Sequence, residues 1–321
     1  MPYRAAGPTA TSFACASCPT EYSEVPGRWR CDCGGPLDLL NVPLPPEDLP
    51  KRLSEREWSW LRYREVLPIQ AMAAVRLGEN CTPMVQLELD DREILVKQEQ
   101  IASTGSFKDR GAFVLVSHAR EIGIASLVED SSGNAGAAIA AYCARAGIGC
   151  DIYVPDATGS AKTRQIETYG ADVVRIDGHR EDTAAAAMLA AERVWYGSHV
   201  WNPFFFHGTK LLAYEIWEQL GFRAPDTLVL PTGNGTLLLG AHIGFSELLA
   251  AALISALPKI VGVQAARCCP VVCAFDGTPP RPAGAKTIAS GIAVAKPARE
   301  RQMVRAVRES GGSFVTVEDS D

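Results

Sequence analysis

The sequence predicts an α/β protein of two lobes, built on open parallel sheets, with a small cysteine-rich segment in front of them. Its 321 residues are enough for about two domains. Beyond residue 125, short apolar runs alternate with longer amphipathic segments, a pattern typical of parallel strand and helix units. Four of the ten cysteines lie within the first 33 residues, where the segment has little apolar mass of its own.

The amino-terminal cysteines have a spacing similar to that of a zinc ribbon. Cys15-x2-Cys18 and Cys31-x-Cys33 are separated by twelve residues, and two glycines follow the second pair. Two thiol pairs on turns can close a tetrahedral zinc site, although the second pair is one residue shorter than in a usual knuckle. We therefore expect residues 1–42 to form either a structural zinc site or a metal-free ribbon.

The segments that follow are predicted as strands and helices in strict alternation. Pro-rich stretches after residue 41 and near residue 279 indicate a linker and a surface loop. The expected strands lie at 125–130, 150–155, 171–176 and 227–231, and the expected helices at 137–146, 160–170, 181–195 and 237–253.

The segment 101–113 contains the first candidate for chemistry. Ser106 and Asp109 fit a capping box, so a helix should begin near Phe107 with Lys108 in its first turn. The positive end of the helix dipole disfavours an ammonium there, which lowers the lysine pKa and suits an amine that forms a Schiff base. The alternative is a solvated lysine at an ordinary helix start.

Two loops between a strand and a helix are candidates for ligand binding. The loop Ser-Ser-Gly-Asn-Ala-Gly at 131–136 lies where open α/β sheets bind ligands, and Asn134 could present its amide to a phenolate or a carboxylate. The loop Thr-Gly-Asn-Gly-Thr at 232–236 offers backbone N–H groups to a phosphate, without the glycine spacing of a dinucleotide site. Either loop could instead be an ordinary turn that needs glycine.

Charge and hydropathy argue against several kinds of partner. The chain has 31 Lys and Arg against 37 Asp and Glu, a net charge of -6, so we expect no nucleic-acid partner. No uninterrupted apolar stretch is long enough for a membrane span, and the amino terminus lacks the apolar region of a secretory signal. We therefore expect a cytoplasmic protein with reduced thiols and no membrane partner.

Several motifs together resemble threonine synthase and its close relatives, pyridoxal-phosphate enzymes of fold type II, which are similar to the tryptophan synthase beta chain. The similarity extends nearly end to end, through the cysteine ribbon, VKQEQIASTGSFKDRGA, SSGNAGAAIAAYCARAGI, NPFFFHGTK, PTGNGTLLLGAHIGF and TIASGIAV. It implies two lobes of three-layer open sheets, a large one from 43–109 with 206–321 and a smaller mobile one from 110–205. It also implies a homodimer.

The resemblance assigns roles to the candidate residues. It implies a Schiff base between pyridoxal 5'-phosphate and Lys108, with Asn134 beside the ring 3'-oxygen. A histidine stands where relatives usually have glutamate, so we expect this side chain to bear on substrate choice. The remaining implied contacts are Gly233, Asn234, Gly235 and Thr236 for the cofactor phosphate, Ser131, Ser132 and Gly133 for the substrate carboxylate, and His207 for the substrate.

The implied reaction is that of a lyase acting on an amino acid. In threonine synthase, O-phosphohomoserine loses phosphate from its γ carbon and water adds at the β carbon. The alternatives are β-elimination from serine or threonine and β-replacement by another nucleophile. A non-enzymatic alternative is a degraded cofactor-binding protein, since relatives continue past the equivalent of Asp321 into a segment whose hydroxyl meets the pyridine nitrogen.

Overall fold

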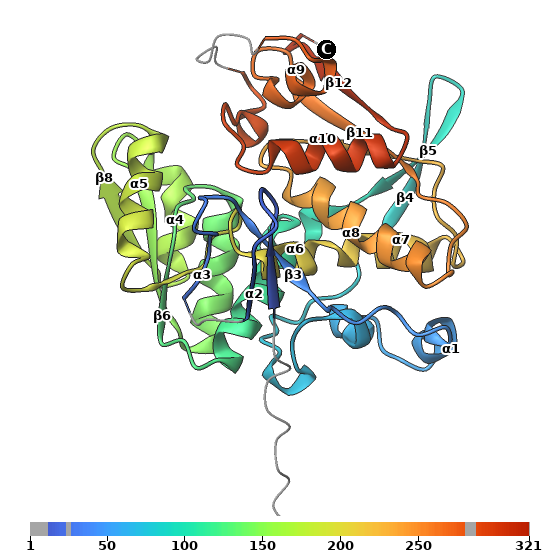
Figure 1. Ribbon diagram of the computed structural model, residues 1–321, viewed down its shortest axis with the longest axis horizontal. Helices are drawn as coiled ribbons and strands as arrows, with labels where there is room; N and C mark the ends of the chain where they lie inside the picture. Colours follow the sequence, from blue (N-terminus) through green and yellow to red (C-terminus); the bar gives the residue numbers. More distant parts are fainter. Residues whose placement is uncertain (1–11, 24–26, 280–286, 321) are drawn as a thin grey trace, which may run out of the picture. The chain divides into compact units, whose positions relative to one another are not determined.

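The chain folds into two compact units. The computed structural model describes residues 12–23, 27–279 and 287–320 (Figure 1). Unit 1 comprises 1–43, 66–79 and 108–205, and unit 2 comprises 44–65, 80–107 and 206–321. By its internal contacts, the segment 110–205 thus belongs to the same unit as 66–79, Lys108 and the cysteine-rich segment. The mobility of 110–205 remains a prediction. Within the described residues, no helix is both long enough and apolar enough to span a bilayer.

The main sheet of unit 1 is parallel, with strand order β8-β7-β6-β9. Helices α2 and α3 lie side by side next to it (Figure 1). Buried residues alternate along β7, as the period of a half-buried strand requires. The elements are β6 (Ser126–Glu129), β7 (Gly149–Pro155), β8 (Asp172–Ile176), β9 (Trp195–Tyr196), α2 (Lys108–Glu121), α3 (Asn134–Ala146), α4 (Ser160–Thr168), α5 (Arg180–Ala190) and the short 3-10 helix η2 (Ala71–Ala73).

The expected helix over 181–195 is wrong at its carboxyl end. Helix α5 stops at Ala190, and Trp195 and Tyr196 instead form β9, which pairs with Leu127 and Val128 of β6. Pairing with a buried strand of the sheet therefore overrides the local helical pattern at this edge. The other predicted elements of this unit are present, and α3 begins three residues earlier than expected.

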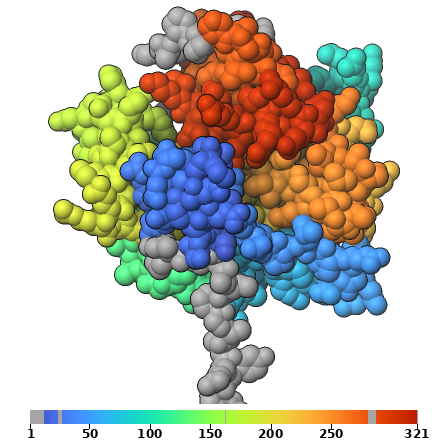
Figure 2. Space-filling view, in the orientation of Figure 1, coloured from blue at the N-terminus to red at the C-terminus, as the bar shows by residue number. Residues whose placement is uncertain are grey.

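The cysteine-rich segment of unit 1 forms a small antiparallel sheet. Its strands are β1 (Ser12–Cys15), β2 (Glu21–Ser23) and β3 (Leu37–Leu40), in the order β2-β1-β3. The dark blue atoms of this segment form one compact body in the space-filling view (Figure 2). Trp29 joins it to a buried cluster with Val128, Ala187 and Tyr196.

Unit 2 contains a second parallel sheet, with strand order β10-β11-β12, and a separate antiparallel hairpin of β4 and β5. Helix α8 is buried along most of its length, which explains its nearly continuous apolar sequence. The elements are α1 (Leu49–Ser54), β4 (Met84–Leu89), β5 (Arg92–Lys97), α7 (Leu211–Gln219), β10 (Thr227–Pro231), α8 (Thr236–Ala250), β11 (Lys259–Ala265), α9 (Pro270–Asp276), α10 (Glu300–Glu309) and β12 (Ser313–Val317), with 3-10 helices η1 (Trp60–Val66), η3 (Glu99–Ile101) and η4 (Ser290–Ile292). Helix α6 (Pro203–Thr209) contains the boundary between the units.

Candidate active site

Lys108 is the first residue of α2, one position after the predicted helix start. Its side chain is partly buried, and its Nζ lies 5.8 Å from the centre of the Phe205 ring. A Cβ atom at Gly111, one turn further along α2, would lie 2.3 Å from an atom of that ring. The glycine therefore leaves room for Phe205 beside the lysine.

The pKa of Lys108 is lowered to about 7, mainly because burial removes water from the ammonium. The Glu129 carboxyl acts in the opposite direction, and the Arg180 charge lowers the pKa further. The direction agrees with the expectation from the sequence, but the main cause is loss of hydration. A substantial fraction of the amine is thus neutral at neutral pH, as a nucleophile or a base requires.

Two residues that the sequence motifs did not single out interact electrostatically with this lysine. Glu129 ends β6, and its Oε1 lies 2.5 Å from Nδ1 of His199, while its Oε2 accepts the backbone N–H of His199 at 3.0 Å. Burial raises the pKa of Glu129 to about 8 and lowers the pKa of His199 well below its ordinary value. Both shifts favour a neutral pair that shares one proton. An acidic residue at the end of an apolar strand was the available signal.

The Ser-Ser-Gly-Asn loop (131–134) connects β6 to α3 in the same unit. Ser131 is buried, and its Oγ accepts the backbone N–H of Gly133 at 3.3 Å. A Cβ atom at Gly136 would lie 2.0 Å from the Ser131 carbonyl oxygen, so this approach requires glycine. Asn134 is the exposed first residue of α3, and the amino-terminal N–H groups of that helix open beside it.

The Gly-Asn-Gly-Thr loop (233–236) of unit 2 ends at the first residue of α8. Gly235 has a φ of 76°, in the left-handed region that favours glycine. The start of α8 is fixed from behind, since the Thr209 hydroxyl donates to the Thr236 carbonyl at 2.8 Å. Gln264 likewise donates to the Thr232 carbonyl at 3.0 Å. The loop is thus a braced helix start with backbone donors, the arrangement that suits a phosphate.

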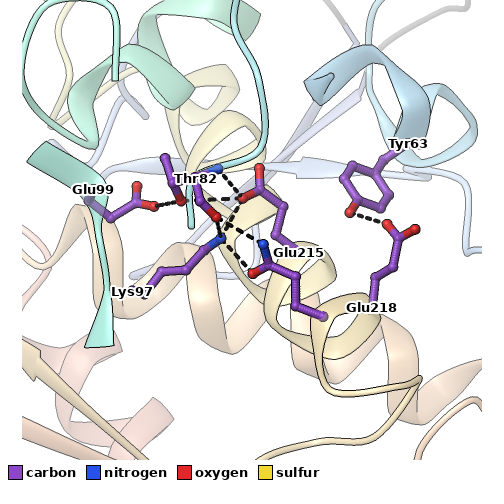
Figure 3. Close-up of polar contacts among 7 residues, drawn as sticks. Tyr63, Thr82, Lys97, Glu99, Glu215 and Glu218 are labelled. Carbon is purple, nitrogen blue, oxygen red and sulfur yellow. Dashed lines mark hydrogen bonds and ion pairs between the residues drawn. The ribbon is translucent and has the colours of Figure 1, made fainter. Parts of the chain in front are cut away.

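Two other lysines of unit 2 have structural roles. Nζ of Lys97 donates to Glu215 at 2.7 Å and to the Thr82 carbonyl, and so ties β5 to α7 (Figure 3). Nζ of Lys210 is fully buried and lies 2.7 Å from Glu247, which also accepts the Tyr214 hydroxyl at 2.7 Å. Each lysine is held by a carboxylate inside its unit.

His207 lies in α6 and is buried. Burial lowers its pKa well below the ordinary value, and the charge of Lys210 acts in the same direction. The imidazole is therefore neutral near pH 7, and among the described residues its Nδ1 has no hydrogen-bond partner. The structure thus favours the uncharged form of this side chain.

The four amino-terminal thiols converge in unit 1. The Sγ atoms of Cys15, Cys18, Cys31 and Cys33 all lie within 4.8 Å of one another. These four residues are referred to below as the four-thiol cluster.

Comparison with known proteins decides the family. A family model described as pyridoxal-phosphate dependent enzyme matches residues 75–321. The chain belongs to this family. Pyridoxal 5'-phosphate is accordingly its cofactor. The candidate catalytic and binding residues described above all lie in the matched region, and only the four-thiol cluster lies outside it.

Its relatives in this family include threonine synthases. The threonine synthase of Methanocaldococcus jannaschii is 34% identical, over 96% of this chain and 79% of the relative. That of Methanosarcina acetivorans is 32% identical, over 96% of this chain and 78% of the relative. The chain is thus a pyridoxal-phosphate-dependent lyase that is similar to threonine synthases.

Solved structures show the same fold. An L-serine ammonia-lyase from Rhizomucor miehei aligns with a TM-score of 0.64 at 20% identity, over 75% of this chain and 76% of that one. The processed threonine deaminase isoform 2 of Solanum lycopersicum aligns with a TM-score of 0.62 at 20% identity, over 91% of this chain and 75% of that one. The parallel α/β architecture of fold type II is therefore shared with these enzymes.

Proposed function

We propose that this enzyme carries out the threonine synthase reaction, in which phosphate leaves the γ carbon of O-phosphohomoserine and water adds at the β carbon. The observation that carries the proposal is Lys108, an amine with a pKa of about 7 at the start of α2. The similarity to two threonine synthases over 96% of the chain supports the choice of reaction.

The residues of this chain fit the cofactor. The Lys108 amine would bond to the cofactor aldehyde, and the backbone N–H groups of 233–236 would hold its phosphate. The left-handed Gly235 supports the second assignment, because it turns the chain into α8 without a side chain. Asn134, at the start of α3, would donate its amide to the ring oxygen.

When bound, pyridoxal phosphate withdraws electrons from the α carbon of an amino acid and so makes its protons acidic. The Lys108 amine is the base that accepts and returns these protons, because its lowered pKa keeps it partly neutral near pH 7. The buried Glu129 carboxyl is neutral below about pH 8. It therefore places no negative charge near Lys108 that would stabilise the ammonium form of the lysine. Ser131, Ser132 and Gly133 would hold the substrate carboxylate at the start of α3.

His207 would meet the leaving group of the substrate. A neutral imidazole donates one hydrogen bond to the leaving group without adding a buried charge. The proposal therefore includes a preference for anionic leaving groups over plain hydroxyls.

A substrate panel tests the reaction. Purified enzyme with cofactor is given O-phosphohomoserine, O-phosphoserine, O-acetylserine, serine and threonine, and phosphate, 2-oxo acid and amino-acid products are measured. Threonine and phosphate in equal amounts from O-phosphohomoserine support the proposal. Ammonia and 2-oxo acid from serine or threonine would indicate a dehydratase, and cofactor absorbance without any product would indicate a binding protein.

Lys108 is tested by trapping. Borohydride reduction of the loaded protein should fix the cofactor mass on the peptide that contains Lys108, and Lys108→Ala should lose both this mass and turnover. The matched control is Lys51→Ala, which removes an exposed lysine of α1 and should leave both unchanged. Trapping on any other lysine contradicts the assignment. Sedimentation of the same samples tests the expected homodimer, and fractionation of cells tests the expected cytoplasmic location.

A further inference from the structure

The four-thiol cluster has the dimensions of a site for one metal ion. The Sγ atoms of Cys15 and Cys33 are 3.6 Å apart, those of Cys18 and Cys31 are 3.5 Å apart, and no pair exceeds 4.8 Å. A tetrahedral zinc ion with bonds of about 2.3 Å places its sulfurs about 3.8 Å apart. All four sulfurs would be used, so the site is closed and structural rather than catalytic.

The backbone around the four-thiol cluster is built for close approach of the sulfurs. The N–H of Ser17 donates to Cys15 Sγ at 3.3 Å, and the Tyr22 hydroxyl lies 3.1 Å from Cys31 Sγ. A Cβ atom at Gly35 would lie 2.9 Å from Cys15 Sγ and 2.7 Å from the Ser17 hydroxyl. Hydrogen bonds to the sulfurs and a glycine that leaves room for them orient the thiols, as neighbouring groups orient the ligands of a metal ion.

One residue between the two cysteine pairs connects this segment to the main sheet of unit 1. The Trp29 ring packs edge-on against Tyr196 at 5.0 Å and against Trp201 at 5.3 Å. Tyr196 lies in β9, and its hydroxyl donates to Oδ1 of Asp130 at 2.7 Å in a buried position. Asp130 directly precedes the Ser-Ser-Gly-Asn loop.

We propose that the four-thiol cluster binds one Zn²⁺, and that this ion fixes Trp29 against Tyr196. The small sheet β2-β1-β3 contributes only a few buried side chains, so metal ligation supplies folding free energy that its own packing does not. Loss of the ion releases Trp29 and thereby weakens the contact that supports Asp130. The ion is thus a positioning element for the loop proposed to hold the substrate carboxylate.

Metal content tests the first half of the proposal. The full chain, purified under reducing conditions, should contain one zinc per chain by elemental analysis, and Co²⁺ added to the zinc-stripped protein should give the absorption bands of a tetrahedral thiolate site. Cys33→Ser should lower Co²⁺ affinity at least tenfold. The matched control is Cys268→Ser, which removes a partly exposed thiol of unit 2 and should retain one zinc.

Two outcomes overturn the first half. One is reduced protein that neither contains zinc nor takes up Co²⁺. The other is recovery of the four cysteines as two disulfides after alkylation without reductant, since their paired distances also permit that chemistry in an oxidised protein.

Hydrogen exchange tests the second half without reference to turnover. Removal of zinc should increase amide exchange at 130–134 and at 195–199 severalfold, while exchange in the parallel sheet of unit 2 stays unchanged. Trp29→Ala should produce the same increase although zinc stays bound, because it removes the contact and keeps the ligands. Unchanged amide exchange at 130–134 in both the zinc-free protein and Trp29→Ala would refute the proposal that the ion positions this loop.

Discussion

Glu129 and His199, 70 residues apart in the sequence, form a bidentate contact in the interior of unit 1. One carboxylate oxygen meets the ring Nδ1 at 2.5 Å, and the other accepts the backbone N–H at 3.0 Å. Neither side chain is exposed to solvent by more than 5%. An ionised Glu129 raises the pKa of Lys108, so the protonation of this pair bears on the protonation of the proposed base.

Glu129→Gln should leave the pKa of Lys108 at about 7, because the Glu129 carboxyl, with a pKa of about 8, is already neutral in the pH range in which Lys108 titrates. The measurement is brief acylation of the cofactor-free protein over a range of pH, with mass spectrometry of the peptide that contains Lys108. Labelling follows the neutral amine, so its midpoint should stay near pH 7. Lys51 is the internal control and should not move. A midpoint for Lys108 that moves to lower pH would show that Glu129 is ionised there and would contradict the neutral pair.

Lys108→Met should stabilise the cofactor-free protein at neutral pH. Folding lowers the lysine pKa from 10.5 to about 7, so the unfolded chain binds a proton that the folded chain releases. The free-energy cost of burying the Lys108 ammonium is complete below about pH 7 and disappears as the pH rises towards 10.5. We therefore expect a gain of about 1–2 kcal/mol at pH 7 that shrinks at pH 9, by urea unfolding. A gain that grows with pH would have the wrong sign.

Glu247→Gln should destabilise unit 2 by about 3–5 kcal/mol, because it leaves the buried Lys210 ammonium without its carboxylate. The measurement is equilibrium unfolding in urea. Glu192→Gln, an exposed change, should stay within about 0.5 kcal/mol of the parent. The double variant Lys210→Met with Glu247→Leu should recover most of the loss. A loss below about 1 kcal/mol in Glu247→Gln would show that water reaches the pair.

Gly235→Ala should weaken both stability and cofactor affinity. An added Cβ at this position would lie 2.1 Å from Met303 Sδ. Gly221→Ala is the matched control, since Gly221 has a φ of 68° and no atom within 4 Å of its Cβ. It should lose only the backbone cost of about 1–2 kcal/mol. Gly235→Ala should lose more of the free energy of unfolding, and excess cofactor should restore part of its activity. Equal losses of stability in the two variants would exclude the clash with Met303.

His207→Glu should shift substrate preference from phosphorylated to uncharged amino acids. A carboxylate in place of the neutral imidazole repels an anionic leaving group, so the ratio of kcat/KM for O-phosphohomoserine over serine should fall at least tenfold. His207→Gln keeps a neutral donor and should retain most of the ratio. Equal ratios in all three proteins would mean that His207 only shapes α6.

The turns that need glycine and the order of several strands and helices were predictable, because they depend on local physics. The start of α2 at Lys108, the glycine at 235 and the strands β6, β7, β8 and β10 follow from capping, positive φ and apolar period over short windows. The spacing of the cysteines likewise predicted that two pairs of thiols would meet.

Tertiary structure decided what those residues are able to do. The lysine pKa falls because burial strips its water, and burial depends on residues far away in the sequence, such as Phe205. Residues 195–196 leave the predicted helix because β6 offers a buried edge to pair with. His199 meets Glu129 only because β6 and the segment after β9 are neighbours in the sheet. The sequence alone therefore determined which groups are present and the order of most helices and strands between residues 125 and 250. The packing decided the charge of those groups, because hydration and charge pairing are set by contacts that no local window contains.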